Sequence, residues 1–279
     1  MPPPLGITGS TGNLGGRIAR LLAAAGVEQR LVVRSPARAP SLPKVEVAEA
    51  AYADQDAVRR ALDGLDTVLM VSAKESATRL QEHVGFVDAA AAAGVRHLVY
   101  VSFYGAAPDA TLTLAREHHH TEQHIEQSGM VWTHLRDNAY ADYFPLLAGE
   151  DGVMRGPAGD GRVAAVAQAD IAAAAVAALL DPRAHEGHTY SLTGPEALTL
   201  TEAAAVMSQV LGRPYSFVDE TVEEAYASRA AFGAPGWQLD AWVSSYTAIA
   251  AGELAGVTSD VELLTGRAPM ALADVLASH

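Results

Sequence analysis

The stretch TGSTGNLGG, residues 8–16, decides the fold of this 279-residue chain. Its glycines Gly9, Gly12 and Gly15 are spaced three apart and follow directly on the short apolar run 5–8, ahead of a helical pattern. At such a junction the first glycine permits a tight turn, the second lets the backbone approach a pyrophosphate, and the third lets the helix pack on the strand. The stretch therefore predicts a dinucleotide-binding loop, which we favour over an ordinary strand-to-helix connection.

Two kinds of backbone group in this stretch can bind a pyrophosphate. The glycines leave room for it, and the first N–H groups of the following helix have no partner within that helix and attract phosphate. The residues expected to contact the cofactor here are Gly9, Ser10, Thr11, Gly12, Asn13, Leu14 and Gly15.

Short apolar runs alternate with helical patterns on either side of this loop. The runs are apolar on both faces, as the strands of a buried parallel sheet are. This alternation, with short connections, predicts an α/β fold with a doubly wound parallel sheet of the Rossmann type. The predicted strands are residues 5–8, 30–33, 45–47, 67–71, 98–101 and 131–135, and the predicted helices are 14–25, 56–62, 78–93 and one that ends at 128–129.

The rhythm of the chain changes near residue 151. The segments GPAGDGR and LTGPEALTL are rich in turn residues, and helices that carry Trp237, Trp242 and Tyr246 follow them. We expect a dinucleotide-binding Rossmann domain over residues 1–150. A smaller substrate-binding region over 151–279 would pack on the carboxyl ends of its strands, where such folds bind ligands, with some segments returning to the Rossmann sheet.

Composition excludes several classes of protein. The formal net charge is −14, and no basic stripe is present to neutralise phosphates, so we expect no nucleic-acid partner. No apolar run reaches the ~18 residues of a membrane span and no signal peptide is visible, which makes the cytoplasm the expected location. The chain has no cysteine, which excludes disulfides and thiolate catalysis.

The second predicted strand indicates which dinucleotide binds. An NAD site usually has an Asp or Glu at the end of this strand, where it holds the ribose 2′-hydroxyl. Here the strand ends in LVVRSPAR, so Arg34 takes the place of the acidic residue and Arg38 follows. Guanidinium groups suit a 2′-phosphate. We therefore predict NADP(H), with a solvated basic turn as the alternative interpretation.

Longer segments give the chain a family resemblance. They include VVRSPAR (32–38), DAAAAAGVRHLVYVS (88–102) and HHHTEQHIEQSGMVWTHLRDNAYADYFP (118–145). With the glycine loop, they resemble the NmrA-like branch of the atypical short-chain dehydrogenases/reductases. The likeness is closest to the NADPH:quinone oxidoreductase type 2 and triphenylmethane reductase group.

The resemblance implies where the catalytic residues lie. Most of the wider superfamily uses a Tyr-x-x-x-Lys pair on the helix after the fifth strand. The lysine position aligns with His118 and the tyrosine position with Leu114, so the usual pair is replaced. We expect His118 to hydrogen-bond the ribose or the substrate and to titrate near neutral pH. Ser102, at the position of a catalytic serine, is a second candidate, with an ordinary turn residue as the alternative.

The segment LRDNAYADYFP resembles a family segment that borders the nicotinamide and the substrate. It departs from the family pattern at Asp137 (family Asn) and at Ala139 (family Trp). Two further departures are Gln168, in place of an arginine, and Ala51, in place of an aspartate. We expect the cofactor also to contact Ser72, Asp137 and Asn138, and the substrate to contact Tyr104, Tyr140, Tyr143 and Phe144.

The histidine run His118–His120 could also suggest a metal site. His120 and His124 are four residues apart on a helix, but nothing nearby except Glu117 offers a third ligand. Consecutive histidines point to different sides of a helix. We therefore expect no metal.

These observations together predict an NADPH-dependent reductase of a quinone or similar conjugated electrophile. Hydride transfer to such a substrate needs little besides positioning, and water can protonate the product. The expected partner is a small electrophilic molecule, and formation of a homodimer is left open. The alternative is an NmrA-type regulatory protein that senses NADP(H) without turning it over.

Overall fold

The computed structural model describes residues 5–278, which contain a seven-stranded sheet in the order β3-β2-β1-β4-β5-β6-β9. This order, which grows outward from β1 on both sides, confirms the doubly wound α/β fold predicted from the sequence. The strands are β1 (Leu5–Thr8), β2 (Gln29–Val33), β3 (Val45–Glu49), β4 (Thr67–Val71), β5 (His97–Phe103), β6 (Val131–Asp137) and β9 (His188–Leu192).

The centre of the sheet is buried on both faces. Ile7 of β1 pairs in parallel with Leu31 of β2 and with Leu69 of β4, and all three side chains are fully buried. Strands of this kind come from continuous apolar runs because helices cover both faces. The two neighbouring parallel pairs bring the carboxyl ends of β1, β2 and β4 to one edge, directly beside the glycine loop.

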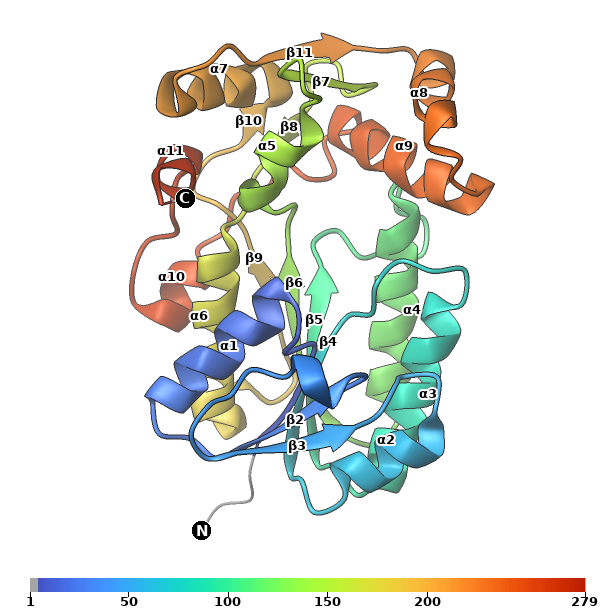
Figure 1. Cartoon of the computed structure of the whole chain (residues 1–279), viewed down its shortest axis with the longest axis vertical. Helices are drawn as coiled ribbons and strands as arrows, with labels where there is room; N and C mark the ends of the chain where they lie inside the picture. The colour runs from blue at the N-terminus through green and yellow to red at the C-terminus, as the bar shows by residue number, and fades with distance from the viewer. Residues whose placement is uncertain (1–4, 279) are drawn as a thin grey trace. The chain divides into compact units, whose positions relative to one another are not determined.

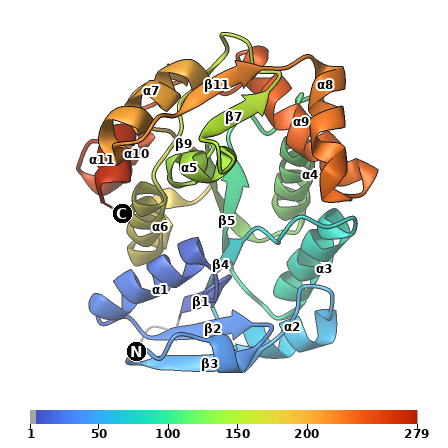
Figure 2. The ribbon, with the colours of Figure 1, turned by 45° about the horizontal axis from the view of Figure 1, so that its top comes forward.

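Helices cover the two faces of this sheet. α1 and α6 lie on one face and α2, α3 and α4 lie on the other (Figure 1), and Figure 2 shows the same division from a second direction. Within residues 5–278 no helix is both long and apolar enough to span a membrane. The helix bounds are α1 (Asn13–Ala24), α2 (Gln55–Leu62), α3 (Arg79–Ala92), α4 (Thr113–Gln127) and α6 (Gln168–Leu180).

The chain forms two compact units, each assembled from several segments. Unit 1 comprises residues 1–102, 118–136 and 171–190, and unit 2 comprises 103–117, 137–170 and 191–279. The domain boundary near residue 150 therefore stays a prediction. The remaining elements are α5 (Phe144–Leu147), β7 (Val153–Gly156), β8 (Arg162–Val163), β10 (Leu198–Thr199), α7 (Leu200–Leu211), β11 (Ser216–Asp219), α8 (Val222–Arg229), α9 (Gly236–Ala250), α10 (Asp260–Thr265), α11 (Leu272–Ala277) and the 3₁₀ turns η1 (Pro36–Arg38), η2 (Ala141–Tyr143), η3 (Pro182–His185) and η4 (Ala230–Phe232).

Unit 2 has its own apolar core. β7 and β11 pair in parallel, and Met154 and Met207 are fully buried in one cluster with Phe144. Gly156 of β7 has no room for a side chain, because a Cβ there would lie 2.3 Å from the ring of Tyr246. This close approach fixes α9 against β7 within the unit.

Candidate cofactor and catalytic site

The glycine loop has the geometry that its sequence predicts. Gly9 has a φ of +66°, a conformation that strongly favours glycine, and its carbonyl accepts a 2.9 Å hydrogen bond from the N–H of Gly12. A Cβ on Gly15 would lie 2.5 Å from the carbonyl oxygen of Gly9. Only a glycine at residue 15 therefore allows α1 to pack this closely on the loop.

The N-terminus of α1 and Ser10 provide donors for an anionic group. Gly12 caps α1 without a side chain, and the first turn holds no acidic residue. Ser10 is only 2% exposed, and its Oγ has no hydrogen-bond partner within the described residues 5–278. A buried hydroxyl without a partner, beside free helix N–H groups, fits the phosphates of a dinucleotide. The geometry of the loop is therefore compatible with phosphate binding, and the cofactor roles of its residues stay predictions.

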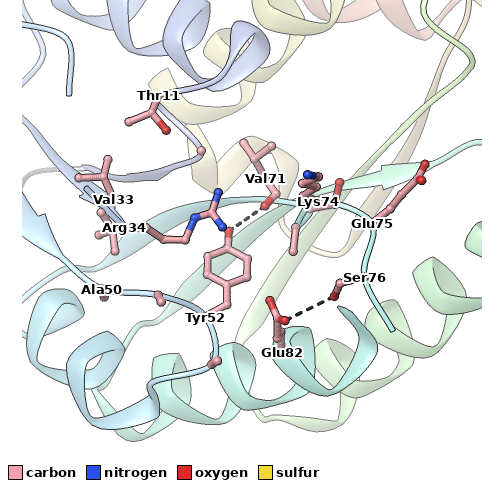
Figure 3. A pocket seen from close by; sticks show the side chains of 16 residues that line it. Thr11, Val33, Arg34, Ala50, Tyr52, Val71, Lys74, Glu75, Ser76 and Glu82 are labelled. Carbon is pink, nitrogen blue, oxygen red and sulfur yellow. Dashed lines mark hydrogen bonds between the residues drawn. The ribbon is translucent and has the colours of Figure 1, made fainter. Parts of the chain in front are cut away.

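A cavity of about 480 Å³ adjoins this loop in unit 1 (Figure 3). Gly9, Thr11, Arg34 and Ser72, all predicted cofactor residues, line it, and Arg34 is exposed. The other predicted cation, Arg38, is exposed on η1 and does not line this cavity. The remaining lining residues are Val32, Val33, Ala50, Ala51, Tyr52, Ala53, Val71, Ala73, Lys74, Glu75, Ser76 and Glu82.

Tyr52 also lines this cavity and was not predicted from the sequence. Its hydroxyl lies 2.6 Å from Thr8 Oγ1 and 2.7 Å from the carbonyl oxygen of Val71, and Thr8 Oγ1 accepts a 2.8 Å bond from the N–H of Val71. Burial raises the pKa of the phenol above its ordinary value, so Tyr52 stays protonated. Tyr52 thus links the ends of β1 and β4 to the segment after β3. In that segment the family resemblance implies an aspartate, where this chain has Ala51.

His118, the leading catalytic candidate, is buried and has partners on both ring nitrogens. Its Nε2 lies 2.8 Å from a guanidinium nitrogen of Arg79, and its Nδ1 lies 2.9 Å from the hydroxyl of Tyr100. Arginine can only donate, so Nε2 accepts and the ring hydrogen sits on Nδ1. Burial, and then the charge of Arg79, hold the pKa of His118 well below 6.5. This differs from the expectation that His118 titrates near neutral pH.

Arg79 and His83 connect this histidine to the 480 Å³ cavity, and neither was predicted from the sequence. Arg79 Nε donates a 2.9 Å bond to the carbonyl of Ala73, and His83 Nε2 accepts a 2.8 Å bond from the N–H of the same residue. On its other side, His83 Nδ1 lies 3.0 Å from Thr121 Oγ1 on α4. Both polar groups of Ala73, a cavity residue, are therefore held by two buried side chains of α3.

The pKa of His83 also lies far from neutrality. Burial, followed by the positive charge of Arg79, lowers the pKa of His83 to about 3. The ring is therefore neutral at physiological pH and can accept the bond from Ala73 N–H, which leaves Nδ1 to donate to Thr121. The arrangement provides fixed hydrogen bonds and carries only the charge of Arg79.

Ser102, the second catalytic candidate, has its hydroxyl committed to a carboxylate. The side chain is fully buried, and Oγ donates a 2.6 Å bond to Glu122 Oε1. Glu122 also accepts two bonds from Arg136, of 2.8 and 2.6 Å. The catalytic role of Ser102 stays a prediction, and its present contacts join β5, α4 and β6 within unit 1.

In unit 2, Asp137 and Tyr140 form a buried pair. Asp137 is 3% exposed, and its Oδ2 accepts a 2.7 Å bond from the Tyr140 hydroxyl. Burial raises the pKa of Asp137 from 3.8 to about 8, although the bond from Tyr140 opposes the rise. At neutral pH this carboxyl is therefore mostly protonated.

The other predicted residues of unit 2 differ in their surroundings. The amide of Asn138 bonds the Ala139 N–H at 2.7 Å and the carbonyl of Leu254 at 3.0 Å, so its side chain holds the local backbone. Tyr104 is half-buried and donates its N–H to the carbonyl of Asp137 at 2.8 Å. Tyr143 is 39% exposed with its ring 5.4 Å from that of Tyr140, and Phe144 is buried in the core. Their substrate and cofactor roles stay predictions.

The other histidines of α4 do not gather around one point. His120 is exposed, and His124 Nε2 lies 2.7 Å from Asp88 Oδ1. Within residues 5–278 no three histidine, aspartate or glutamate side chains lie together in a way that could hold a metal ion. Leu114, at the superfamily's tyrosine position, packs against the apolar core of unit 2.

The chain matches the family described as NAD(P)H-binding over residues 9–182. It is 38% identical to the (4-alkanoyl-5-oxo-2,5-dihydrofuran-3-yl)methyl phosphate reductase of Streptomyces griseus, over 98% of this chain and 96% of that one. It is 33% identical to quinone oxidoreductase 2 of Escherichia coli, covering 97% and 96% of the two chains. It is also 33% identical to the NAD(P)H azoreductase of Xenophilus azovorans, covering 98% and 96%.

Solved structures agree with these relatives. The NADPH complex of quinone oxidoreductase QOR2 from Escherichia coli superposes with a TM-score of 0.89 at 32% identity, over 98% of this chain and 99% of that one. Triphenylmethane reductase of Citrobacter sp. superposes with a TM-score of 0.86 at 27% identity, over 99% and 98%. The chain therefore belongs to the NAD(P)H-binding reductase family that includes quinone oxidoreductase 2, and it is an NAD(P)H-dependent oxidoreductase.

Proposed function

We propose that the protein uses NADPH to reduce a quinone or a similarly conjugated electrophile by direct hydride transfer. The observation that supports this most is the state of His118. A neutral histidine with both nitrogens bonded, together with Leu114 at the tyrosine position, leaves α4 without the proton donor that the superfamily's tyrosine supplies. Substrates that are already electrophilic accept a hydride without prior protonation, whereas simple ketones need an acid at their oxygen.

Residues of unit 1 are suited to hold the cofactor. The phosphates would lie on the glycine loop, with Ser10 Oγ and the first N–H groups of α1 as donors. Arg34, exposed at the 480 Å³ cavity, would pair with the 2′-phosphate that distinguishes NADPH from NADH. When bound, the reduced nicotinamide supplies a hydride. The buried network of Arg79, His83 and His118 would keep the segment around Ala73 in the position that receives the cofactor.

The names of the relatives support the class of acceptor. A quinone, an azo compound and a dihydrofuranone that carries both an oxo and an alkanoyl group all contain a double bond polarised by electronegative atoms. Reduction of each begins well with a hydride at an electron-poor atom. We propose the same class for this chain, and the shape of its own pocket would choose among such acceptors.

Steady-state NADPH oxidation with a panel of quinones, an azo dye and a simple ketone tests this proposal. We expect turnover with the conjugated acceptors, a kcat/KM for the ketone at least about a hundredfold lower, and a KM for NADPH that rises in Arg34→Ala. Arg59→Ala, which removes an exposed arginine of α2 that does not line the cavity, is the control. Tight NADPH binding without oxidation by any acceptor would favour the regulatory sensor instead.

A further inference from the structure

The Asp137–Tyr140 pair has an unusual electrostatic setting. The carboxyl is nine-tenths buried or more, it accepts one hydrogen bond from the Tyr140 hydroxyl at 2.7 Å, and its backbone carbonyl is bonded to Tyr104 N–H. Within residues 5–278 no lysine, arginine or histidine pairs with it. A carboxylate in such a place would be a buried charge without a counter-ion, which is costly, and the group stays protonated instead.

The groups around the pair reinforce this state. Burial, then Asp137, and more weakly Tyr143 and Asp142 raise the pKa of the Tyr140 phenol well above 10, and the ring of Tyr143 lies 5.4 Å from that of Tyr140. The Asp142 carboxylate itself accepts the N–H of Gln168 at 2.8 Å. Additional negative charge is therefore disfavoured here, and the pair carries an exchangeable proton. The pKa of Asp137, raised to about 8, places that proton within reach of neutral-pH chemistry.

We propose that the Asp137–Tyr140 pair is the proton source of this enzyme, with Tyr140 donating to the substrate oxygen and Asp137 resupplying Tyr140. The inference rests on the proposed function and adds to it the group that completes the reduction. Tyr140 is half-buried, whereas Asp137 is enclosed, so Tyr140 is the member of the pair that we assign to contact with the substrate. In this assignment Tyr140 is the catalytic residue and Asp137 acts through it.

A quinone or an enone gains two electrons and one hydrogen as a hydride, and its displaced π electrons move to a carbonyl oxygen, which becomes negative. The Tyr140 hydroxyl turns from Asp137 to the substrate, and its O–H bond breaks as a new O–H bond forms on that oxygen. The proton of Asp137 then passes to the phenol oxygen, which lies 2.7 Å from Oδ2. Asp137 is left as a carboxylate and takes a proton from water before the next turnover.

A buried neutral acid next to a phenol also suits the negative charge that develops on the substrate oxygen during hydride transfer, before the proton moves. In a site of low dielectric, a phenol that receives a hydrogen bond from a buried neutral acid stabilises a growing oxyanion in the transition state more than it stabilises the ground state. An asparagine at residue 137 could donate a hydrogen bond to Tyr140 but could not resupply a proton. Asp137→Asn therefore removes the proton supply but keeps the shape of the side chain and its ability to hydrogen-bond Tyr140.

The first test compares an acceptor that takes up a proton with one that does not. Menadione needs a hydride and a proton, whereas the crystal violet cation becomes neutral on receiving a hydride alone. In Asp137→Asn and in Tyr140→Phe we expect the ratio of kcat/KM for menadione to that for crystal violet to fall about tenfold or more. Changes in NADPH binding cancel in this ratio. Asp151→Asn, which removes an exposed carboxylate of unit 2 that pairs with Arg155, is the matched control.

The second test observes the proton without turnover. In protein labelled at the aspartate carboxyl carbons, a ¹³C NMR titration should show one resonance that titrates near pH 8 in the unmutated chain and is absent from Asp137→Asn. If every aspartate titrates below about pH 5, or if the acceptor ratio is unchanged in both variants, the proton-source assignment is wrong. If the unmutated protein oxidises NADPH with neither acceptor, the proposed function fails, and the titration still judges the state of the pair.

Discussion

Arg79 donates a hydrogen bond to Nε2 of His118 across 2.8 Å, and both side chains are buried in unit 1. The contact fixes the histidine as a neutral acceptor, because a protonated ring would place two cationic donors against each other. At the helix position where the superfamily has a lysine, this chain thus carries no charge of its own. The permanent positive charge sits instead on Arg79, at the start of α3.

Replacement of His118 should slow the enzyme without stopping it. His118→Ala leaves the Arg79 donor without its acceptor and the Tyr100 oxygen without its donor, and we expect kcat/KM with menadione to fall roughly tenfold to a hundredfold. Because the histidine is neutral, the pH profile between 5.5 and 8.5 should keep its shape. His120→Ala, on the exposed face of the same helix, is the control. A loss of about ten-thousandfold, or an acid limb that disappears in the variant, would identify His118 as a general acid.

Substitution of Arg79 or His83 should raise the KM for NADPH more than it lowers kcat. Arg79→Gln and His83→Phe each release one polar group of Ala73, a residue of the cavity wall, and we expect the KM for NADPH to rise about tenfold with a smaller change in kcat. The matched control is Arg59→Gln, since Arg59 is exposed on α2 and forms only a 3.7 Å ion pair with Asp56. Equal effects on kcat and KM, or none on either, would contradict the positioning role.

Cofactor choice should depend on Arg34. We expect NADPH to bind at least about tenfold tighter than NADH, which is ~1.4 kcal/mol, mostly through a charge-assisted bond to the 2′-phosphate. Arg34→Ala should remove most of this preference, and Arg38→Ala, which changes a residue outside the cavity lining, should remove less. Calorimetric titration of both cofactors measures this. Equal affinities in the unmutated protein would show that Arg34 does not read the phosphate.

The buried Asp137 carboxyl should make folding stability depend on pH in a defined direction. Its pKa is raised from 3.8 to about 8 in the folded chain, so above pH 4 the unfolded chain loses a proton that the folded chain keeps. The free energy of unfolding therefore falls as pH rises from about 4 to about 8. Asp137→Asn removes this penalty.

Urea unfolding of both proteins at several pH values checks this sign. The stability of Asp137→Asn relative to the unmutated chain should grow between pH 4.5 and 8 and then level off. Asp151→Asn, which removes a fully exposed carboxylate, should show no such gain. A stability difference that stays constant with pH would mean that Asp137 titrates normally.

Local sequence signals were sufficient for the fold and for the cofactor loop. Gly9, Gly12 and Gly15 act through their own backbone, and the apolar runs identify buried strands wherever they occur, so both were predictable. Arg34 directly follows β2, so its position was also predictable from the local sequence. The prediction of strand β4 agrees with the structure at both ends, residues 67–71.

Long-range packing determined what the sequence did not predict. Arg79 and His83 occur in TRLQEHVGF, which reads as an ordinary polar helix start, and they are buried only because α3 packs beside α4. Tyr52 acquires its role from two strands that are distant in sequence. The protonation states of His118 and Asp137 depend on burial and on neighbours, and burial of a polar side chain is not visible in a linear pattern.

Transfer of deuterium from [4,4-²H₂]NADPH to an enone acceptor under anaerobic single-turnover conditions tests whether a hydride passes directly from the cofactor to the substrate. We expect deuterium on a carbon of the product, a primary isotope effect on NADPH oxidation, and a comparable single-turnover rate constant in His120→Ala. Oxidation of NADPH without deuterium in the product, or no oxidation with any conjugated acceptor, would contradict direct hydride transfer.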